Sequence, residues 1–109
     1  FIDPVEDIVR ASVETGADAV EFHTGAYANA REIEIGRQLD RLFDAATCAV
    51  ENSIAVHAGH GLNYLNTPPV LEMPGLEEVN IGHAIVSRSV FTGLEKAVRE
   101  MKDLINRCS

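Results

Sequence analysis

Cysteine is scarce in this sequence. Only two of the 109 residues are cysteine, Cys48 and Cys108, and they lie far apart without a CxxC pair or another spacing typical of metal sites. This scarcity argues against a disulfide framework and against a cysteine-based metal centre. We expect both residues to be reduced thiols.

Long apolar runs are also missing. No stretch approaches the roughly 18 consecutive apolar residues of a membrane-spanning helix. The first residues, FIDPVED, lack the basic and apolar regions of a signal peptide. We therefore expect a cytoplasmic protein without a membrane partner. The first residue is Phe1 rather than methionine, which suggests a segment of a longer protein.

Basic residues are few: nine Lys and Arg stand against 17 Asp and Glu, for a formal net charge of −8. No basic cluster offers a track for a phosphate backbone, so nucleic acid is a poor candidate partner. A small anionic ligand remains open, because backbone N–H groups and helix N-termini can hold a phosphate without net positive charge.

The patterns that are present alternate between helix and strand. With 46% hydrophobic residues the chain can bury one sizeable core, which predicts one domain or part of one. Short β-rich runs predict strands at 19–23, 53–59 and 77–82. Apolar residues at helical spacing predict helices at 4–15, 32–50 and 92–105, with shorter ones at 70–72 and 83–90 and a loop after residue 23. Candidate capping boxes are Asp3 with Glu6, Asn29 with Glu32, and Thr92 with Glu95. This order is typical of βαβ units around a parallel sheet.

The expected strands have one apolar and one polar face. Side chains alternate across a strand, so one face carries Val20, Phe22, Ile54, Val56, Val79 and Ile81, and the other carries Glu21, His23, Ala55, His57 and Asn80. A buried polar face costs several kcal/mol unless its groups are paired or solvated. We expect it to line a cavity.

A glycine–histidine pair follows two of these strands, in AGHG at 58–61 and in IGHA at 81–84. In a (β/α)₈ barrel the site lies at the C-terminal ends of the strands, and phosphate commonly binds after the last two. Plainer interpretations remain open: His57 can be a core residue, Arg88 a surface residue, and Tyr27 and Tyr64 loop packing. The histidines do not have the helical spacing of a zinc motif, so no metal is expected.

Three segments resemble pyridoxine 5′-phosphate synthase: EFHTGAYANA at 21–30, HAGHGLNYLNTPPV at 57–70 and VNIGHAIVSRSVFTGLEKAVREMKDLI at 79–105. The resemblance runs through nearly the whole chain and implies an α/β fold, a parallel (β/α)₈ TIM barrel. Residues 1–109 would be the C-terminal part of this single domain, about half of it, with strand 5 ending at 1–3 and strands 6, 7 and 8 at 19–23, 53–57 and 78–81. Alone, such a piece is expected to be inactive, because a barrel needs about 200 residues or more.

The resemblance also implies an activity, the condensation of 3-amino-2-oxopropyl phosphate with 1-deoxy-D-xylulose 5-phosphate to pyridoxine 5′-phosphate, inorganic phosphate and water in vitamin B6 biosynthesis. No cofactor takes part. By this analogy His60 is a catalytic acid/base, Glu21 stabilises a transition state and Gly61 contacts substrate. Gly82 and His83 would bind phosphate at the start of the short helix. The partners implied are small phosphorylated substrates, inorganic phosphate and further copies of the chain in a homo-oligomer.

The chain departs from the family at His57, where family members commonly have asparagine, so hydrogen bonding beneath His60 is expected to differ. The family's other histidine, glutamate and arginine of the site lie on early strands and cannot be assigned here. Two rival interpretations are another phosphate-handling TIM-barrel enzyme and a non-catalytic half-barrel that binds phosphate.

Overall fold

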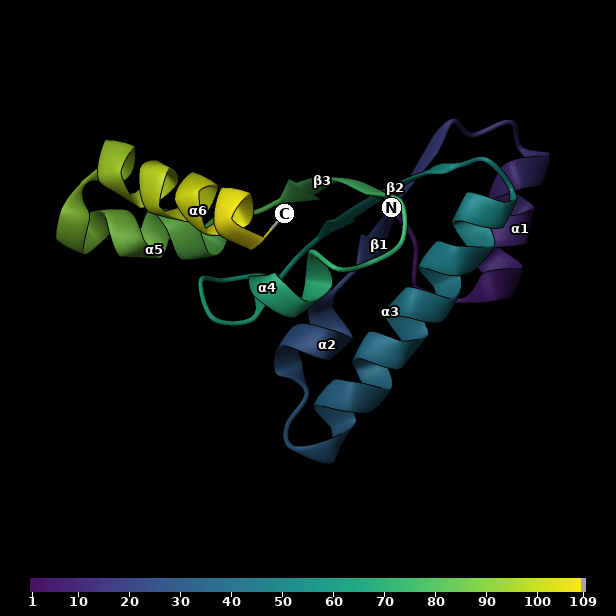
Figure 1. Ribbon diagram of the computed structural model, residues 1–109, viewed down its shortest axis with the longest axis horizontal. Helices are drawn as coiled ribbons and strands as arrows, with labels where there is room; N and C mark the ends of the chain where they lie inside the picture. Colours follow the sequence, from purple (N-terminus) through teal and green to yellow (C-terminus); the bar gives the residue numbers. More distant parts are fainter. Residues whose placement is uncertain (109) are drawn as a thin grey trace.

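The computed structural model of the protein describes residues 1–108 and shows an α/β fold around a three-stranded parallel sheet (Figure 1). The strands are β1 (Ala19–His23), β2 (Ala55–Gly59) and β3 (Leu76–Asn80), in the order β1-β2-β3. The helices are α1 (Glu6–Glu14), α2 (Gly25–Asn29), α3 (Ile33–Glu51), α4 (Thr67–Val70), α5 (His83–Thr92) and α6 (Leu94–Cys108). The predicted parallel α/β arrangement is confirmed.

The register of the sheet aligns two rows of polar positions across the strands. Glu21 pairs with His57 and His57 with Glu78, and one step nearer the C-terminal edge His23, Gly59 and Asn80 form the next row. The ladder between β2 and β3 shifts by one residue between Val56 and His57. Because the side-chain period is two, this irregularity lets Leu76 pack against the core while Glu78 and Asn80 share the polar face.

The predicted division into two faces is confirmed. Val20, Phe22 and Val56 are buried in a core with Val9 of α1 and Leu42 of α3. Full burial of a side chain such as Phe22, which has no exposed surface, contributes about 1.5 to 3 kcal/mol. On the opposite face, Glu21, His23 and His57 are half-buried and Asn80 is exposed. Helices α1 and α3 thus cover one face of the sheet, and the other stays open to polar chemistry.

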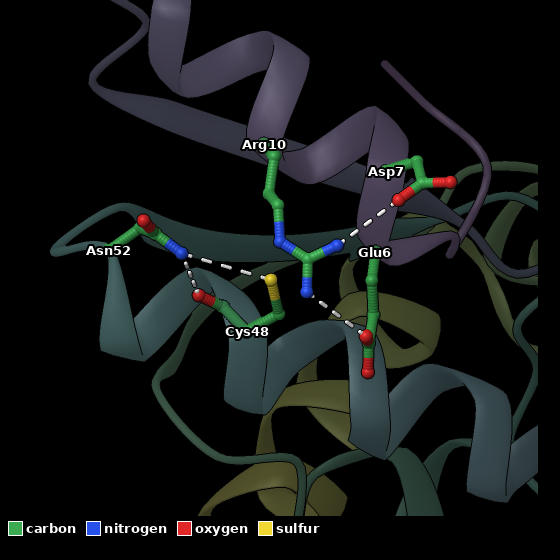
Figure 2. Close-up of polar contacts among 5 residues, drawn as sticks. All are labelled: Glu6, Asp7, Arg10, Cys48 and Asn52. Atoms are coloured by element: carbon green, nitrogen blue, oxygen red, sulfur yellow. Dashed lines mark hydrogen bonds and ion pairs between the residues drawn. The ribbon is translucent and has the colours of Figure 1, made fainter.

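The molecule is elongated, with extents of 44 × 31 × 21 Å. Helices α1 and α3 lie at one end, and the hairpin of α5 and α6 lies at the other, beyond β3 (Figure 1). Within α1, Arg10 donates hydrogen bonds to Glu6 and Asp7, and at the end of α3 Asn52 Nδ2 donates to the Cys48 carbonyl at 2.8 Å (Figure 2). The Arg10 pairs are exposed and contribute little to stability. The Cys48 thiol is free and buried.

The first helix begins later than the sequence predicts. Ile2 is bound to the sheet, where its N–H donates to Glu21 O at 2.9 Å and its carbonyl accepts from His23 N at 2.8 Å. The chain needs the next three residues to leave the sheet, so α1 starts at Glu6 with Val5 as N-cap and without a side-chain cap. The expected capping by Asp3 is therefore wrong. The predicted end is correct, because Gly16 has the left-handed φ of 81° that terminates a helix.

The other two capping boxes and one loop are also wrong. Asn29 ends the short helix α2, which occupies the segment expected to be a loop. Glu32 is the N-cap of α3 but makes no side-chain cap bond. Gly93 separates α5 from α6, so Thr92 belongs to α5, where its hydroxyl lies 3.3 Å from Arg88 O. The short helix expected at 70–72 lies at Thr67–Val70, because prolines are tolerated in a first turn whose N–H groups need no partner.

Among the helices that the structure describes, none combines the length and the apolar character of a membrane span. Closure into a full barrel stays a prediction.

Two glycines, one in α3 and one that contacts it, give a direct test of how the segment before β3 packs on α3. An alanine Cβ at Gly75, where φ is 71°, would lie 2.5 Å from Val50 Cγ2, whereas one at Gly36 would meet nothing within 4 Å. We expect Gly75→Ala to lower the free energy of unfolding by about 1 to 3 kcal/mol, and Gly36→Ala to raise it by about 0.5 to 1 kcal/mol. Chemical denaturation of both variants measures this. Equal effects would contradict the close approach of Gly75, the residue before β3, to Val50 of α3.

Candidate functional site

Four of the five predicted site residues line one cavity at the C-terminal edge of the sheet. Because the strands are parallel, the loops after β2 and β3 leave the sheet at the same edge. A cavity of ≈ 370 Å³ lies there, and its lining residues are His60, Gly61, Leu62, Asn80, Ile81, Gly82 and His83. The two glycine–histidine pairs, which are separate in the sequence, are thus neighbours in space.

Glu21, the fifth predicted residue, is not in the lining but reaches Asn80, a lining residue, across β2. Its Oε1 accepts a hydrogen bond at 3.0 Å from Nδ2 of Asn80, which lines the cavity. The Glu21 side chain passes over Gly59 of β2, where an added Cβ would lie 2.4 Å from Glu21 Oε2. The missing side chain of Gly59 therefore makes the room in which the carboxylate lies. An uncharged amide, rather than a cation, orients it.

His60 has an unusual backbone conformation. Its φ is 86°, in the left-handed region that few residues other than glycine adopt, and Gly61 follows with φ 78°. The His60 ring is stacked on that of His23, with ring centroids 4.5 Å apart and planes inclined by 35°. Strained backbone of this kind clusters at functional sites. The structure thus places the predicted acid/base in a specially shaped turn.

The partner ring of His23 is itself held in place. Gly25 N donates to His23 Nδ1 at 3.0 Å, so a neutral His23 carries its proton on Nε2. An added Cβ at Gly25 would lie 2.3 Å from His23 Cε1 and 3.1 Å from His60 Cδ2. The start of α2, which the sequence did not predict, therefore accommodates both imidazoles.

Gly82 and His83 form the start of α5, a ten-residue helix without a side-chain cap. The first N–H groups of a helix lack intrahelical acceptors and carry partial positive charge, which favours an anion. An added Cβ at Gly82 would meet nothing within 4 Å, so the backbone here is open to the cavity. The geometry fits a small anion at this turn.

Two residues whose roles the sequence left open have partners elsewhere. His57 Nδ1 lies 3.1 Å from Glu78 Oε2 on the polar face, a pairing that the sequence analysis missed. Arg88 Nε donates to Glu100 Oε2 at 3.1 Å on the α5–α6 hairpin, away from the cavity. This hydrogen bond lowers the pKa of Glu100 and raises the pKa of Arg88.

The two tyrosines join loops to the helices. Tyr27 OH donates to Asn66 O at 2.5 Å, and Tyr64 OH donates to Ala97 O at 2.6 Å. Burial raises the pKa of both hydroxyls, with Glu100 adding to the effect at Tyr64, which keeps them protonated as donors. Both residues thus serve packing of the loops.

Comparison with known proteins decides the family. The model of the family described as pyridoxal phosphate biosynthesis protein PdxJ matches residues 1–107. The chain belongs to the PdxJ family. The resemblance seen in the sequence is thereby confirmed.

Curated relatives of this chain are named pyridoxine 5′-phosphate synthase. The protein from Trichlorobacter lovleyi is 50% identical over 108 residues, which cover 98% of this chain and 45% of that protein. The one from Geobacter sulfurreducens is 49% identical, covering 96% and 44%, and the one from Synechocystis is 50% identical, covering 94% and 43%. The chain thus spans about half the length of the curated relatives it matches.

The space at Gly59 can be tested directly. Gly59→Ala would place its Cβ against Glu21 Oε2 and 3.1 Å from Asn80 O. We expect a loss of about 1 to 3 kcal/mol in the free energy of unfolding, and displacement of the Glu21 carboxylate in a crystal structure.

The control is the same substitution with the carboxylate removed. In a Glu21→Ala background, Gly59→Ala is expected to cost clearly less, because the closest contact is gone. An equal cost in both backgrounds would show that the carboxylate does not occupy this space.

Proposed function

We propose that this chain is the C-terminal half of a (β/α)₈ barrel with pyridoxine 5′-phosphate synthase activity. The barrel would condense 3-amino-2-oxopropyl phosphate with 1-deoxy-D-xylulose 5-phosphate, releasing inorganic phosphate and water. The observation that carries this proposal is the convergence of His60, Gly61, Gly82 and His83 on one cavity, with Glu21 beside it. Membership of the PdxJ family and the names of the relatives support it.

The start of α5 would anchor phosphate. Both substrates and one product carry a phosphate ester, and a further phosphate leaves as the inorganic ion. Gly82 lets the ligand approach the backbone closely, and His83 adds an imidazole at the same turn. No positive side chain is needed there, which agrees with a net charge of −8. Gly61, which also lines the cavity, would contact the substrate.

His60 would move protons during ring closure. Imine formation, loss of water and aromatisation each need a proton to be added or removed, and an imidazole does both near neutral pH. His60 is exposed to the cavity and adjoins the phosphate turn. Glu21, oriented by Asn80, would stabilise positive charge that develops at the amine during condensation.

Several features of the chain support completion by further strands. The sheet has three strands, and β3 has a partner on one side only among the described residues. Large apolar side chains of the α5–α6 hairpin are exposed, including Val90 (79%) and Phe91 (85%). Such exposure marks surfaces that another part of the protein covers. In this proposal residues 1–109 are one part of a single domain, in a cytoplasmic homo-oligomer whose ligands are phosphorylated small molecules.

Substitution of His60 tests the chemistry. The assay uses a completed enzyme, in which the N-terminal half of the Trichlorobacter lovleyi relative is fused ahead of Phe1. His60→Asn is expected to lower kcat on the order of 10²- to 10⁴-fold, because proton transfer is lost, and to leave the affinity for inorganic phosphate nearly unchanged.

His57→Asn is the matched control for this variant. It removes an imidazole of β2, the strand just before His60, that pairs with Glu78 outside the cavity lining, so turnover is expected to stay close to that of the parent. If the fused protein shows no turnover before any substitution, the result would instead support a non-catalytic binding module. Equal activity of His60→Asn and His57→Asn would reject His60 as the acid/base.

Substitution of Gly82 tests the phosphate turn. Gly82→Val meets no protein atom within 4 Å of its Cβ, so the fold is expected to remain and any loss reports on the ligand. We expect the affinity for inorganic phosphate, measured by calorimetry, to fall about tenfold or more, because the side chain blocks the approach to the N–H groups. Gly36→Val, equally uncrowded but distant, is the control. Unchanged phosphate binding in Gly82→Val would place the anion elsewhere.

A further inference from the structure

The His60 side chain lies on the side of the sheet that strand alternation does not predict. If β2 continued in extended form, residue 60 would share the apolar face with Val56 and Ala58. Its ring instead stacks on His23, which belongs to the polar face. The left-handed φ of 86° at His60 accounts for this reversal. The position of the imidazole thus depends on a backbone conformation that a histidine adopts only at a cost.

Thr24, the residue directly after β1 and the N-cap of α2, holds that conformation. Its N–H donates to Gly59 O at 2.9 Å. Its hydroxyl lies 2.8 Å from Gly59 O and 2.6 Å from His60 O, so the single hydroxyl proton is shared between the two carbonyls. These bonds fasten the residue before the turn and the turn itself. Thr24 also follows His23 directly. It therefore connects the segment that carries the His23 ring, by hydrogen bonds, to the turn that carries the His60 ring.

Thr24 has no contact with the cavity. Its side chain is completely buried, and the hydroxyl is engaged with the two carbonyls. Any influence on the reaction must therefore pass through the geometry of the turn.

We propose that Thr24 is a positioning residue that holds His60 in its left-handed conformation and so directs the imidazole into the cavity. The inference deepens the proposed function and rests on it for the role of His60. Removing the hydroxyl leaves the His60 carbonyl without this donor, while Gly59 O keeps the bond from the Thr24 N–H. The turn is then released at His60, which can relax to negative φ and carry the imidazole away from His23.

Thr67 shows what an ordinary buried threonine does in the same protein. It is also completely buried, and its hydroxyl donates at 2.6 Å to Asn63 O. That acceptor lies four residues earlier in the same segment, so the bond closes a local turn. Thr24 instead bonds residues 35 and 36 positions away on another strand. The two residues match in type and burial and differ in what their hydroxyls hold.

The test compares Thr24→Val, Thr24→Ser and Thr67→Val in the completed enzyme. Thr24→Val keeps the shape of the side chain but not the hydroxyl, and we expect kcat to fall on the order of 10²-fold through misplacement of His60, with affinity for inorganic phosphate retained. Thr24→Ser keeps the hydroxyl and is expected to restore most of the turnover. Thr67→Val is expected to lose thermal stability but little kcat. Equal losses of kcat in Thr24→Val and Thr67→Val would overturn the proposal, as would unchanged kcat in Thr24→Val.

A double-mutant cycle and a structure separate this proposal from the proposed function. If Thr24 acts only through His60, Thr24→Val has no further effect on kcat in a His60→Asn background. In a crystal structure of Thr24→Val, His60 is expected to leave positive φ and its ring to leave His23. A His60 that keeps φ near 86° overturns the role of Thr24 whatever the activity. A displaced His60 with unchanged turnover in His60→Asn would keep the role of Thr24 in holding the turn and reject His60 as the acid/base.

Discussion

Parallel pairing of β1, β2 and β3 in one register is the constraint on which the site depends. It places His23, Gly59 and Asn80 in one row and sends the loops that follow β2 and β3 out at one edge. Antiparallel pairing would put alternate loops at opposite edges and separate the two glycine–histidine pairs. The bulge opposite Val56 is part of the same constraint, because it brings Glu78 and Asn80 onto the polar face while Leu76 stays with the core.

Features that follow from the periodicity of apolar residues, such as the two faces of the strands, were predicted well. Alternation identified the apolar face of Val20 and Phe22 and the polar face of Glu21 and His57, since burial of one face is a strong constraint on a strand. Helix starts were predicted poorly. Asp3 could not cap α1 because pairing of Ile2 with the sheet moved the start of the helix, and Asn29 was drawn into α2. At the start of α1, a long-range contact thus overrode the local capping preference.

The contacts that shape the site were mostly invisible in the sequence. The cluster of Glu21, His60 and Gly82 could be anticipated, because the loops that follow parallel strands leave the sheet at the same edge. The roles of Gly59 and Gly25 could not, because both concern space for side chains that come from other segments. Nor does any local pattern connect Thr24 with carbonyls 35 and 36 positions away. A threonine after a strand is common, and only the fold shows what its hydroxyl holds.

The way Glu21 is held has a chemical consequence for any ligand. A carboxylate paired with arginine or lysine has much of its charge neutralised before a ligand arrives. Glu21 is oriented by the amide of Asn80, which fixes its direction without cancelling its charge. The polar side of the sheet therefore holds the Glu21 carboxylate beside the cavity, next to Asn80 of its lining, while the start of α5 lies in the lining itself. In the proposed function, a ligand with an amine at one end and a phosphate at the other would meet both the carboxylate and the N–H groups of α5. A simple phosphate-binding module would need only the N–H groups of α5. A carboxylate on a half-buried strand would add a desolvation cost without a function in such a module.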